Sequence, residues 1–187
     1  TTVFGNGSVE QTTCNAQYIL DRFRIDVPVF SGAGKPLQGE RHIPDLKVHG
    51  SDGLGDTGLA EVFKAGSEKK PAWQHICDTV LANKGRVTLL AIAPLTNLAL
   101  ALRHQPEIAE HVEQVVVMGG AFGTKGRSGN IRPNAEANFF YDAEGASEVL
   151  SAGWPLTVVG LDVTSDCILQ ATQADQLAVT GGDAGAF

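Results

Sequence analysis

The stretch that decides the fold is VTLLAIAPLTNLALALRHQPEIAEHVEQVVVMGG, residues 87–120 of a chain of 187 residues. It contains two continuous apolar runs, Val87–Ile92 and Val115–Met118, and such runs are typical of strands buried in a parallel sheet. Between them, apolar residues recur at helical spacing from Pro94 until Pro106 interrupts them. A strand, a helix and a second strand in this order predict a βαβ unit. The fold class expected is therefore α/β, with an open, mostly parallel sheet and helices on both faces.

Further helices are predicted on both sides of this unit. Ser8 begins one that runs to about Phe23, and Gln11 stands three residues later, as in a capping box. The others are expected at Pro71–Asn83 and at Ala143–Ser151, where Asp142 is a suitable N-cap. Additional strands are expected at Thr1–Phe4, Val27–Phe30 and Leu156–Leu161.

Composition limits the possible functions. Hydrophobic residues make up 43% of the chain and charged residues 19%, which predicts one globular domain spanning residues 1–187. Fourteen Lys and Arg against 21 Asp and Glu give a net charge of −7, so binding to a nucleic-acid backbone is not expected. No apolar run is long enough to cross a membrane, and no basic leader precedes one, so a cytoplasmic location is expected. Cys14, Cys77 and Cys167 are far apart, which favours structural thiols.

Polar residues follow the predicted strands where ligands usually bind. In open α/β sheets, ligands lie beyond the carboxyl ends of the strands. Asn6 follows the predicted strand Thr1–Phe4, and Thr96 follows Val87–Ile92. The other two sites are Asp162 and the loop that follows Met118.

The segment Gly129–Asn138 is the richest in polar groups. It contains Asn130, Asn134, Glu136 and Asn138. If it is extended, Glu136 and Asn138 lie on one face, because side chains alternate along a strand. A carboxylate and amides on one face suit the neighbouring hydroxyls of a polyol. The alternative is a solvated loop with ordinary Asx-turns.

A second segment, His49–Gly55, places an imidazole and the carboxylate of Asp52 among glycines. It lies in the irregular, glycine-rich stretch Ser31–Gly58, and a loop of this length is usually functional. Its spacing matches neither the Walker loop nor the dinucleotide fingerprint. A nucleotide phosphate site is therefore not expected.

Taken in order, these segments resemble the inosine-uridine preferring nucleoside hydrolase family over nearly the whole chain. The motifs that carry the resemblance are Gly5-Asn6, His49-Gly50-x-Asp52-Gly53-Leu54-Gly55, Pro94-Leu95-Thr96-Asn97, Met118-Gly119-Gly120-Ala121, Gly129-Asn130, Ala135-Glu136-x-Asn138 and Gly160-Leu161-Asp162-Val163-Thr164. With so many motifs in the right order, the solvated-loop interpretation of Asn130–Asn138 becomes the weaker one.

The resemblance implies a Rossmann-like fold and a calcium-dependent N-ribohydrolase that cleaves ribonucleosides to ribose and free base. It implies that a calcium-bound water is the nucleophile, that the substrate is a small nucleoside, and that the protein is a homodimer or homotetramer. The substrate-binding residues it implies are Asn6, His49, Met118, Asn130, Glu136 and Asn138. Of these, Asn130 and Glu136 would face the 5′ end of the ribose, and Asn138 the 2′ and 3′ hydroxyls. Thr96 would give its backbone carbonyl to the calcium ion.

The departures from the family pattern are equally specific. The family's aspartate cluster, with the calcium ligands and the general base, would precede Thr1, and its late His-Asp pair would follow Phe187. The resemblance therefore predicts a chain that is incomplete at both ends and contains no catalytic base of its own. Ala137 stands where an aromatic is usual, Ala93 where glycine is usual and Gly145 where alanine is usual. The alternative is a non-catalytic nucleoside- or ribose-binding fragment, or a subunit completed by another chain.

Overall fold

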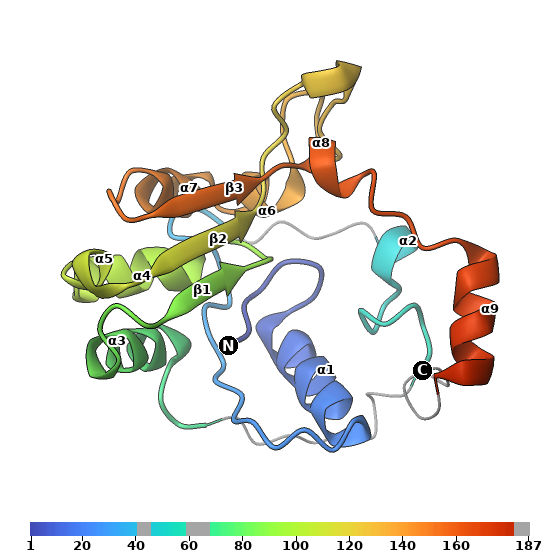
Figure 1. Ribbon diagram of the computed structural model, residues 1–187, viewed down its shortest axis with the longest axis horizontal. Coiled ribbons are helices and arrows are strands. Elements are labelled where there is room, and N and C mark those ends of the chain that lie inside the picture. Colours follow the sequence, from blue (N-terminus) through green and yellow to red (C-terminus); the bar gives the residue numbers. More distant parts are fainter. Residues whose placement is uncertain (41–45, 59–67, 182–187) are drawn as a thin grey trace.

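A parallel three-stranded sheet is the centre of the molecule (Figure 1). The computed structural model describes residues 1–40, 46–58 and 68–181. The strands are β1 (Thr88–Ala91), β2 (Gln114–Met118) and β3 (Leu156–Val159), in the order β1-β2-β3. Leu89 pairs with Val115, and Val115 with Leu156. The βαβ unit and the parallel sheet predicted from residues 87–120 are confirmed.

Helices connect and surround the strands. Their bounds are α1 (Val9–Arg22), α2 (Leu46–His49), α3 (Ala72–Ala82), α4 (Thr96–His104), α5 (Ile108–His111), α6 (Ala137–Tyr141), α7 (Ala143–Leu150), α8 (Leu161–Thr164) and α9 (Ala171–Thr180), with a 3₁₀ turn, η1, at Thr124–Gly126. The predicted start of α1 is confirmed, because the Ser8 side chain accepts a hydrogen bond from the Gln11 amide at 3.2 Å. The Gln11 side chain bonds Asn15 at 2.8 Å.

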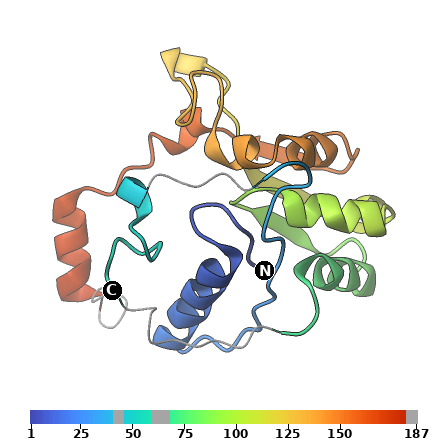
Figure 2. The ribbon, with the colours of Figure 1, turned by 180° about the vertical axis from the view of Figure 1, so that it is seen from behind.

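The main core lies between the sheet and four helices, α3, α4, α5 and α7. Val115 and Val117 of β2 are fully buried against Ile108 of α5 and Val149 of α7. These helices lie in front of the strands in Figure 2, and Figure 1 shows the opposite face of the sheet. The core holds the strand ends, and the loops that leave them, in fixed positions.

The predicted burial of Val87–Ile92 is wrong at three positions, the first of which is the exposed Thr88. Leu90 is 69% exposed and Ile92 is 68% exposed. In the described part of the chain, β1 is the edge strand of the sheet, and the core helices cover only the face opposite Leu90. An apolar run therefore forms the predicted strand without being buried on both sides.

Two further predicted strands, Thr1–Phe4 and Val27–Phe30, are not regular strands. The Thr2 amide donates to the Phe30 carbonyl at 3.0 Å, and the Phe4 amide to the Ala33 carbonyl at 2.9 Å. These are separate bonds rather than a ladder, and Phe30 makes only an isolated bridge, to Glu68. Within the described residues, no helix is long and apolar enough to cross a bilayer.

Candidate functional site

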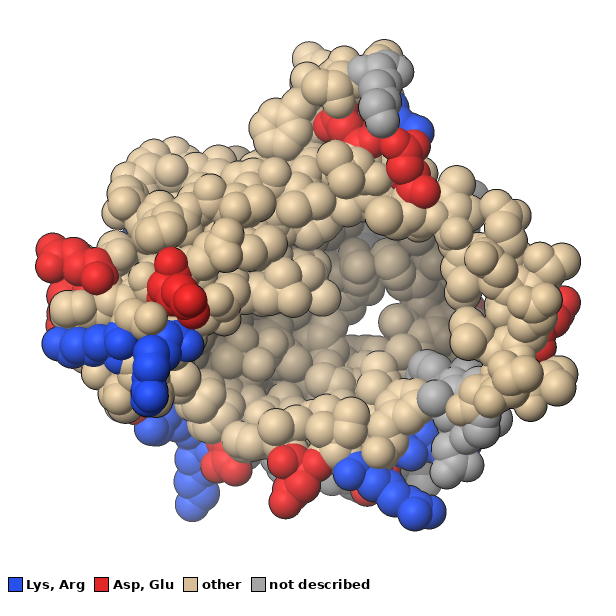
Figure 3. All heavy atoms as spheres, viewed as in Figure 1, with Lys and Arg blue, Asp and Glu red and all other residues tan. Residues whose placement is uncertain are grey.

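One cavity at the carboxyl end of the sheet collects all six residues expected to bind substrate. It has a volume of about 480 Å³. Its lining residues are Asn6, Val48, His49, Ile92, Met118, Asn130, Ile131, Glu136, Ala137, Asn138 and Tyr141. Figure 3 shows a hollow in one face of the molecule, with most of the visible charged side chains around its outside. Residues up to 135 positions apart in the sequence, from Asn6 to Tyr141, thus line one space.

Glu136 is held at this cavity by backbone amides. It is the N-cap of α6, with extended backbone angles (φ −93°, ψ 148°), and is only 2% exposed. Its carboxylate accepts from the amides of Asn138 at 2.9 Å, Gly120 at 3.0 Å and Phe139 at 3.3 Å. A carboxylate has about four acceptor positions, so this arrangement leaves room for about one further donor from the cavity.

Asn138 lies in the first turn of α6, not in a strand. The extended conformation predicted for residues 136–138 is therefore wrong beyond Glu136, because the Glu136 carboxylate caps a helix. The two side chains nevertheless line the same cavity. The Asn138 side-chain amide donates to the Met118 carbonyl at 3.0 Å, and this bond directs its side-chain oxygen away from Met118 as an acceptor for a ligand hydroxyl.

The loop before α6 is a tight turn that requires glycine. The Gly129 amide donates to the Pro133 carbonyl at 2.8 Å. A Cβ at Gly129 would lie 2.2 Å from the Ala135 carbonyl oxygen, a distance that no larger residue tolerates. The next residue, Asn130, accepts from the Ala137 amide at 2.9 Å. The turn thereby brings Asn130 back to the start of α6 and to the cavity.

A buried aspartate organises the loop that carries His49. Asp52 is 4% exposed, and its carboxylate accepts from the amides of Leu54, Asp56 and Gly58 at 2.8–2.9 Å. These bonds, that of Leu54 above all, hold the pKa of Asp52 below its ordinary value. Asp52 therefore orders the loop and is not among the residues that line the cavity.

Asp162 does the same for the loop that follows β2. It is 4% exposed and accepts from the amides of Phe122 and Thr124, both at 2.7 Å, and from the Thr124 hydroxyl at 3.1 Å. The Phe122 bond is the largest cause of a lowered pKa of Asp162. Arg127 in the same loop also forms an ion pair with Asp166. The loop that leads to Asn130 is thus fastened to the end of β3.

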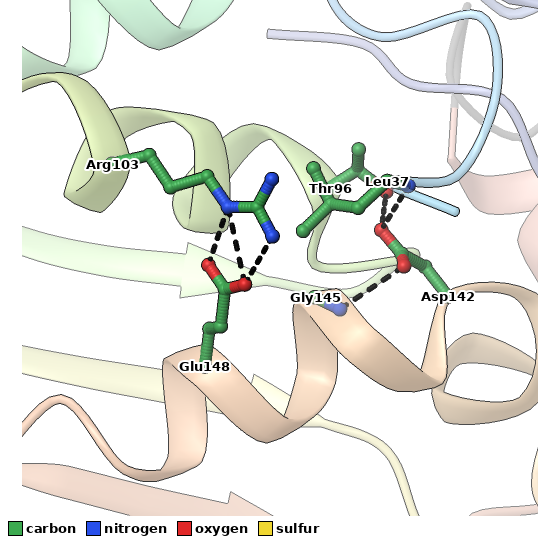
Figure 4. Close-up of polar contacts among 6 residues, drawn as sticks. All are labelled: Leu37, Thr96, Arg103, Asp142, Gly145 and Glu148. Atoms are coloured by element: carbon green, nitrogen blue, oxygen red, sulfur yellow. Dashed lines mark hydrogen bonds and ion pairs between the residues drawn. The ribbon is translucent and has the colours of Figure 1, made fainter.

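Thr96 does not line the cavity. It is the first residue of α4 and is 1% exposed. Its hydroxyl donates to Asp142 at 2.5 Å, and Asp142 also accepts from the amides of Gly145 at 3.0 Å and Leu37 at 3.4 Å (Figure 4). Asp142 therefore joins α4, α7 and the loop at Leu37. The metal-binding role of the Thr96 carbonyl stays a prediction.

Sequence reasoning missed four residues of the lining: Val48, Ile92, Ile131 and Tyr141. Three of them are aliphatic, and nothing in their sequence context separates them from core residues. The position of Tyr141, four residues after Ala137 on one helix, was a signal that could have found it, because such residues share a helix face.

The described residues do not by themselves make a calcium site. Calcium takes six to eight oxygen ligands, usually several carboxylates. Within residues 1–40, 46–58 and 68–181, no three His, Cys, Asp or Glu side chains come together in a suitable group. The buried carboxylates of Asp52, Asp142 and Asp162 are occupied by amide and hydroxyl donors.

A parallel α/β sheet with a cavity of amides and one buried carboxylate at its carboxyl end defines an α/β protein suited to a small hydroxylated ligand. Comparison with known proteins makes the class specific. The family model described as "Inosine-uridine preferring nucleoside hydrolase" matches residues 1–187, and the chain belongs to this family.

Relatives agree with the family match. A pyrimidine-specific ribonucleoside hydrolase, RihB of Escherichia coli O1:K1, is 36% identical over 185 residues, which cover 99% of this chain and 57% of that protein. A solved plant nucleoside hydrolase, PpNRh1, is 33% identical, with a TM-score of 0.89. The match covers 97% of this chain and 57% of the PpNRh1 chain. A purine-preferring ribonucleoside hydrolase from Gardnerella vaginalis is 29% identical with a TM-score of 0.88, over 99% of this chain and 58% of its own. The chain thus spans rather more than half the length of these relatives.

Proposed function

We propose that the protein that contains this chain hydrolyses the N-glycosidic bond of ribonucleosides, and that this chain supplies the ribose-binding part of the active site. One observation carries the proposal. Six residues from distant segments, named from the sequence as substrate-binding, line a single cavity of about 480 Å³. The membership of the chain in a nucleoside hydrolase family supports the same reaction.

The polar groups of the cavity suit this chemistry. Breaking a ribosyl bond builds positive charge on the sugar ring, and a negative or dipolar group fixed beside the ring stabilises that charge more in the transition state than in the ground state. Glu136 is buried and fixed by three amides before any substrate binds. It therefore needs little reorganisation when charge develops. Asn6, Asn130 and Asn138 would hold and orient the sugar hydroxyls.

We propose calcium as the cofactor of the whole protein on family membership alone. Carboxylates outside this chain would supply most of its ligands, and the Thr96 carbonyl would supply one. A bound ion of this kind makes a coordinated water more acidic. A homodimer or homotetramer is proposed on the same resemblance, and the cytoplasmic location expected from the sequence stays a proposal.

A second function has one observation in its favour. The polar lining is present, but the described residues contain no group able to hold a metal. A binding protein for nucleosides or ribose, or a subunit completed by another chain, would have these features too.

The experiment that separates these functions measures both binding and base release. The full-length protein is incubated with uridine and with inosine, free base and ribose are quantified by chromatography, and binding is measured by calorimetry. Release of both products supports the hydrolase. Binding without release supports the second function, and neither binding nor release would overturn both.

A further inference from the structure

A buried tyrosine completes the wall of the cavity. Tyr141 is the last residue of α6 and is 6% exposed. It lines the same cavity as Glu136 and Asn138 and has no role in the chemistry described above. A large aromatic side chain with a polar end, buried at a ligand cavity, is a common means of orienting a ligand.

The ring of Tyr141 is held by packing. It belongs to a small core cluster with Val3 and Phe4, and its centroid lies 6.4 Å from that of Phe140 in an edge-on arrangement. Contacts on these sides restrict the ring to a narrow range of positions. A side chain held in this way presents the same surface to each ligand that enters.

The polar end of Tyr141 lies within the electrostatic influence of Glu136. Burial, and then the charge of Glu136, raise the pKa of the Tyr141 phenol. The phenol is neutral at neutral pH, and a neutral phenol can take part in hydrogen bonds as donor or acceptor. This places a neutral hydroxyl and a fixed carboxylate in one cavity.

The residue one turn before Tyr141 on α6 is small. Ala137 and Tyr141 are four residues apart on α6 and both line the cavity, as expected for residues that share a helix face. Ala137 contributes only a methyl group. Tyr141 is therefore the large side chain by which this face of α6 bounds the cavity.

We propose that Tyr141 is a substrate-contacting residue. Its hydroxyl bonds one hydroxyl of the sugar, adjacent to the sugar hydroxyl that lies nearest Glu136. Its ring forms the apolar wall beside the sugar. This proposal rests on the proposed function, since it needs a ribose in the cavity. It adds a contact to the six named from the sequence and makes Tyr141 a determinant of which pentoses fit.

The test compares Tyr141→Phe with Tyr18→Phe in the full-length protein. Tyr18 is the other tyrosine of the chain; it lies in α1 and lines none of the cavities that contain Glu136. Substrates are a ribonucleoside and its 2′-, 3′- and 5′-deoxy analogues. Losing one hydrogen bond to a substrate is expected to lower kcat/KM about tenfold for Tyr141→Phe with the parent nucleoside. With one of the three analogues, this loss should shrink to less than about twofold.

The outcomes separate this proposal from the proposed function. Tyr18→Phe is expected to stay within about twofold of wild type. Equal losses with all four substrates, or no loss, would overturn the role of Tyr141 while wild-type turnover still supports the hydrolase. If wild type cleaves nothing, D-ribose titration decides. A tyrosine ultraviolet difference signal that disappears in Tyr141→Phe and in Asn138→Ala but persists in Tyr18→Phe supports the contact. A signal that persists in Asn138→Ala would place the sugar in the other cavity that Tyr141 lines and would overturn it. No ribose-dependent signal in wild type would overturn it.

Discussion

Asn138 is the residue at which the ribose assignment can be tested most sharply. It caps no helix, and among the described residues its side chain bonds Met118 alone. Asn138→Ala is expected to lower kcat about ten- to 150-fold, the equivalent of roughly 1.5–3 kcal/mol, because a hydrogen bond that strengthens in the transition state is lost. The measurement is steady-state kinetics of the full-length protein with a ribonucleoside and with its 2′- and 3′-deoxy analogues.

The matched control is Asn134→Ala, in the same loop but exposed and not part of the cavity lining. It should change kcat by less than about twofold. Asn138→Ala and the loss of a sugar hydroxyl each raise the free energy of activation. If these two increases are additive for both the 2′- and the 3′-deoxy substrate, Asn138 does not contact those hydroxyls.

The cysteines are expected to be chemically dispensable. All three are free, with Cys77 buried and Cys167 exposed. Burial raises the pKa of the Cys77 thiol to about 11, so almost no thiolate forms at neutral pH, and thiolate is the reactive form. Alkylation of the folded protein at neutral pH should modify Cys167, spare Cys77 and leave turnover nearly unchanged, as followed by mass spectrometry and kinetics. Loss of activity in proportion to alkylation, with protection by substrate, would contradict this.

At the scale of elements, Asp142 and Glu148 both join α4 to α7 but in different environments (Figure 4). Asp142 is 2% exposed, caps α7 and accepts from Thr96. Asp142→Ala is expected to lower the free energy of unfolding by about 2–4 kcal/mol, through a lost cap and a buried hydroxyl left without its acceptor. Glu148→Ala breaks a partly exposed ion pair with Arg103 and should cost less than about 1 kcal/mol. Urea denaturation of both variants measures the difference, and equal costs would refute the assigned role of Asp142.

The stability of the fold is expected to depend on pH through Asp162, which holds the loop after β2. Because hydrogen bonds hold the pKa of Asp162 below its ordinary value in the fold, its carboxylate stabilises the folded state at neutral pH. That stabilisation should decline once the pH falls below the ordinary aspartate value of about 3.9, because the unfolded chain then binds a proton that the folded chain does not, and the stabilisation is lost as the pH falls through the lower folded-state pKa. The gap in unfolding midpoint between wild type and Asp162→Asn should therefore narrow in acid. Asp175→Asn, on the exposed helix α9, serves as the control, and a gap that widens in acid would refute the argument.

Helix ends could be predicted from sequence far better than strand partners. Ser8, Pro71 and Asp142 define helix starts by local chemistry, which the sequence carries directly. The strand propensity of Thr1–Phe4 says nothing about which segment will pair with it, and in the fold its bonds reach Phe30 and Ala33. The helix at residues 137–141 was missed because its N-cap is Glu136, and glutamate is not among the residues that usually cap helices.

The candidate site was predictable where motifs matched and not elsewhere. The six polar or sulfur-containing residues of the cavity were named from family motifs, whereas Ile131 and Tyr141 enter the lining only through the tertiary fold. The roles of Asp52 and Asp162 likewise depend on loop conformation, because Asp52 accepts from backbone amides of its own loop and Asp162 from amides of the loop after β2.

At the scale of the whole molecule, the central claim is that the cavity of Glu136 and Asn138 receives ribose. The chain contains a competing cavity of about 550 Å³, lined by Pro36, Gln38, Glu40 and residues 140–144. The most direct measurement is a crystal structure of the full-length protein with D-ribose bound. The account predicts sugar hydroxyls within about 3.2 Å of the Glu136 carboxylate and the Asn138 side chain. Ribose bound in the competing cavity, or away from Glu136 and Asn138, would contradict it.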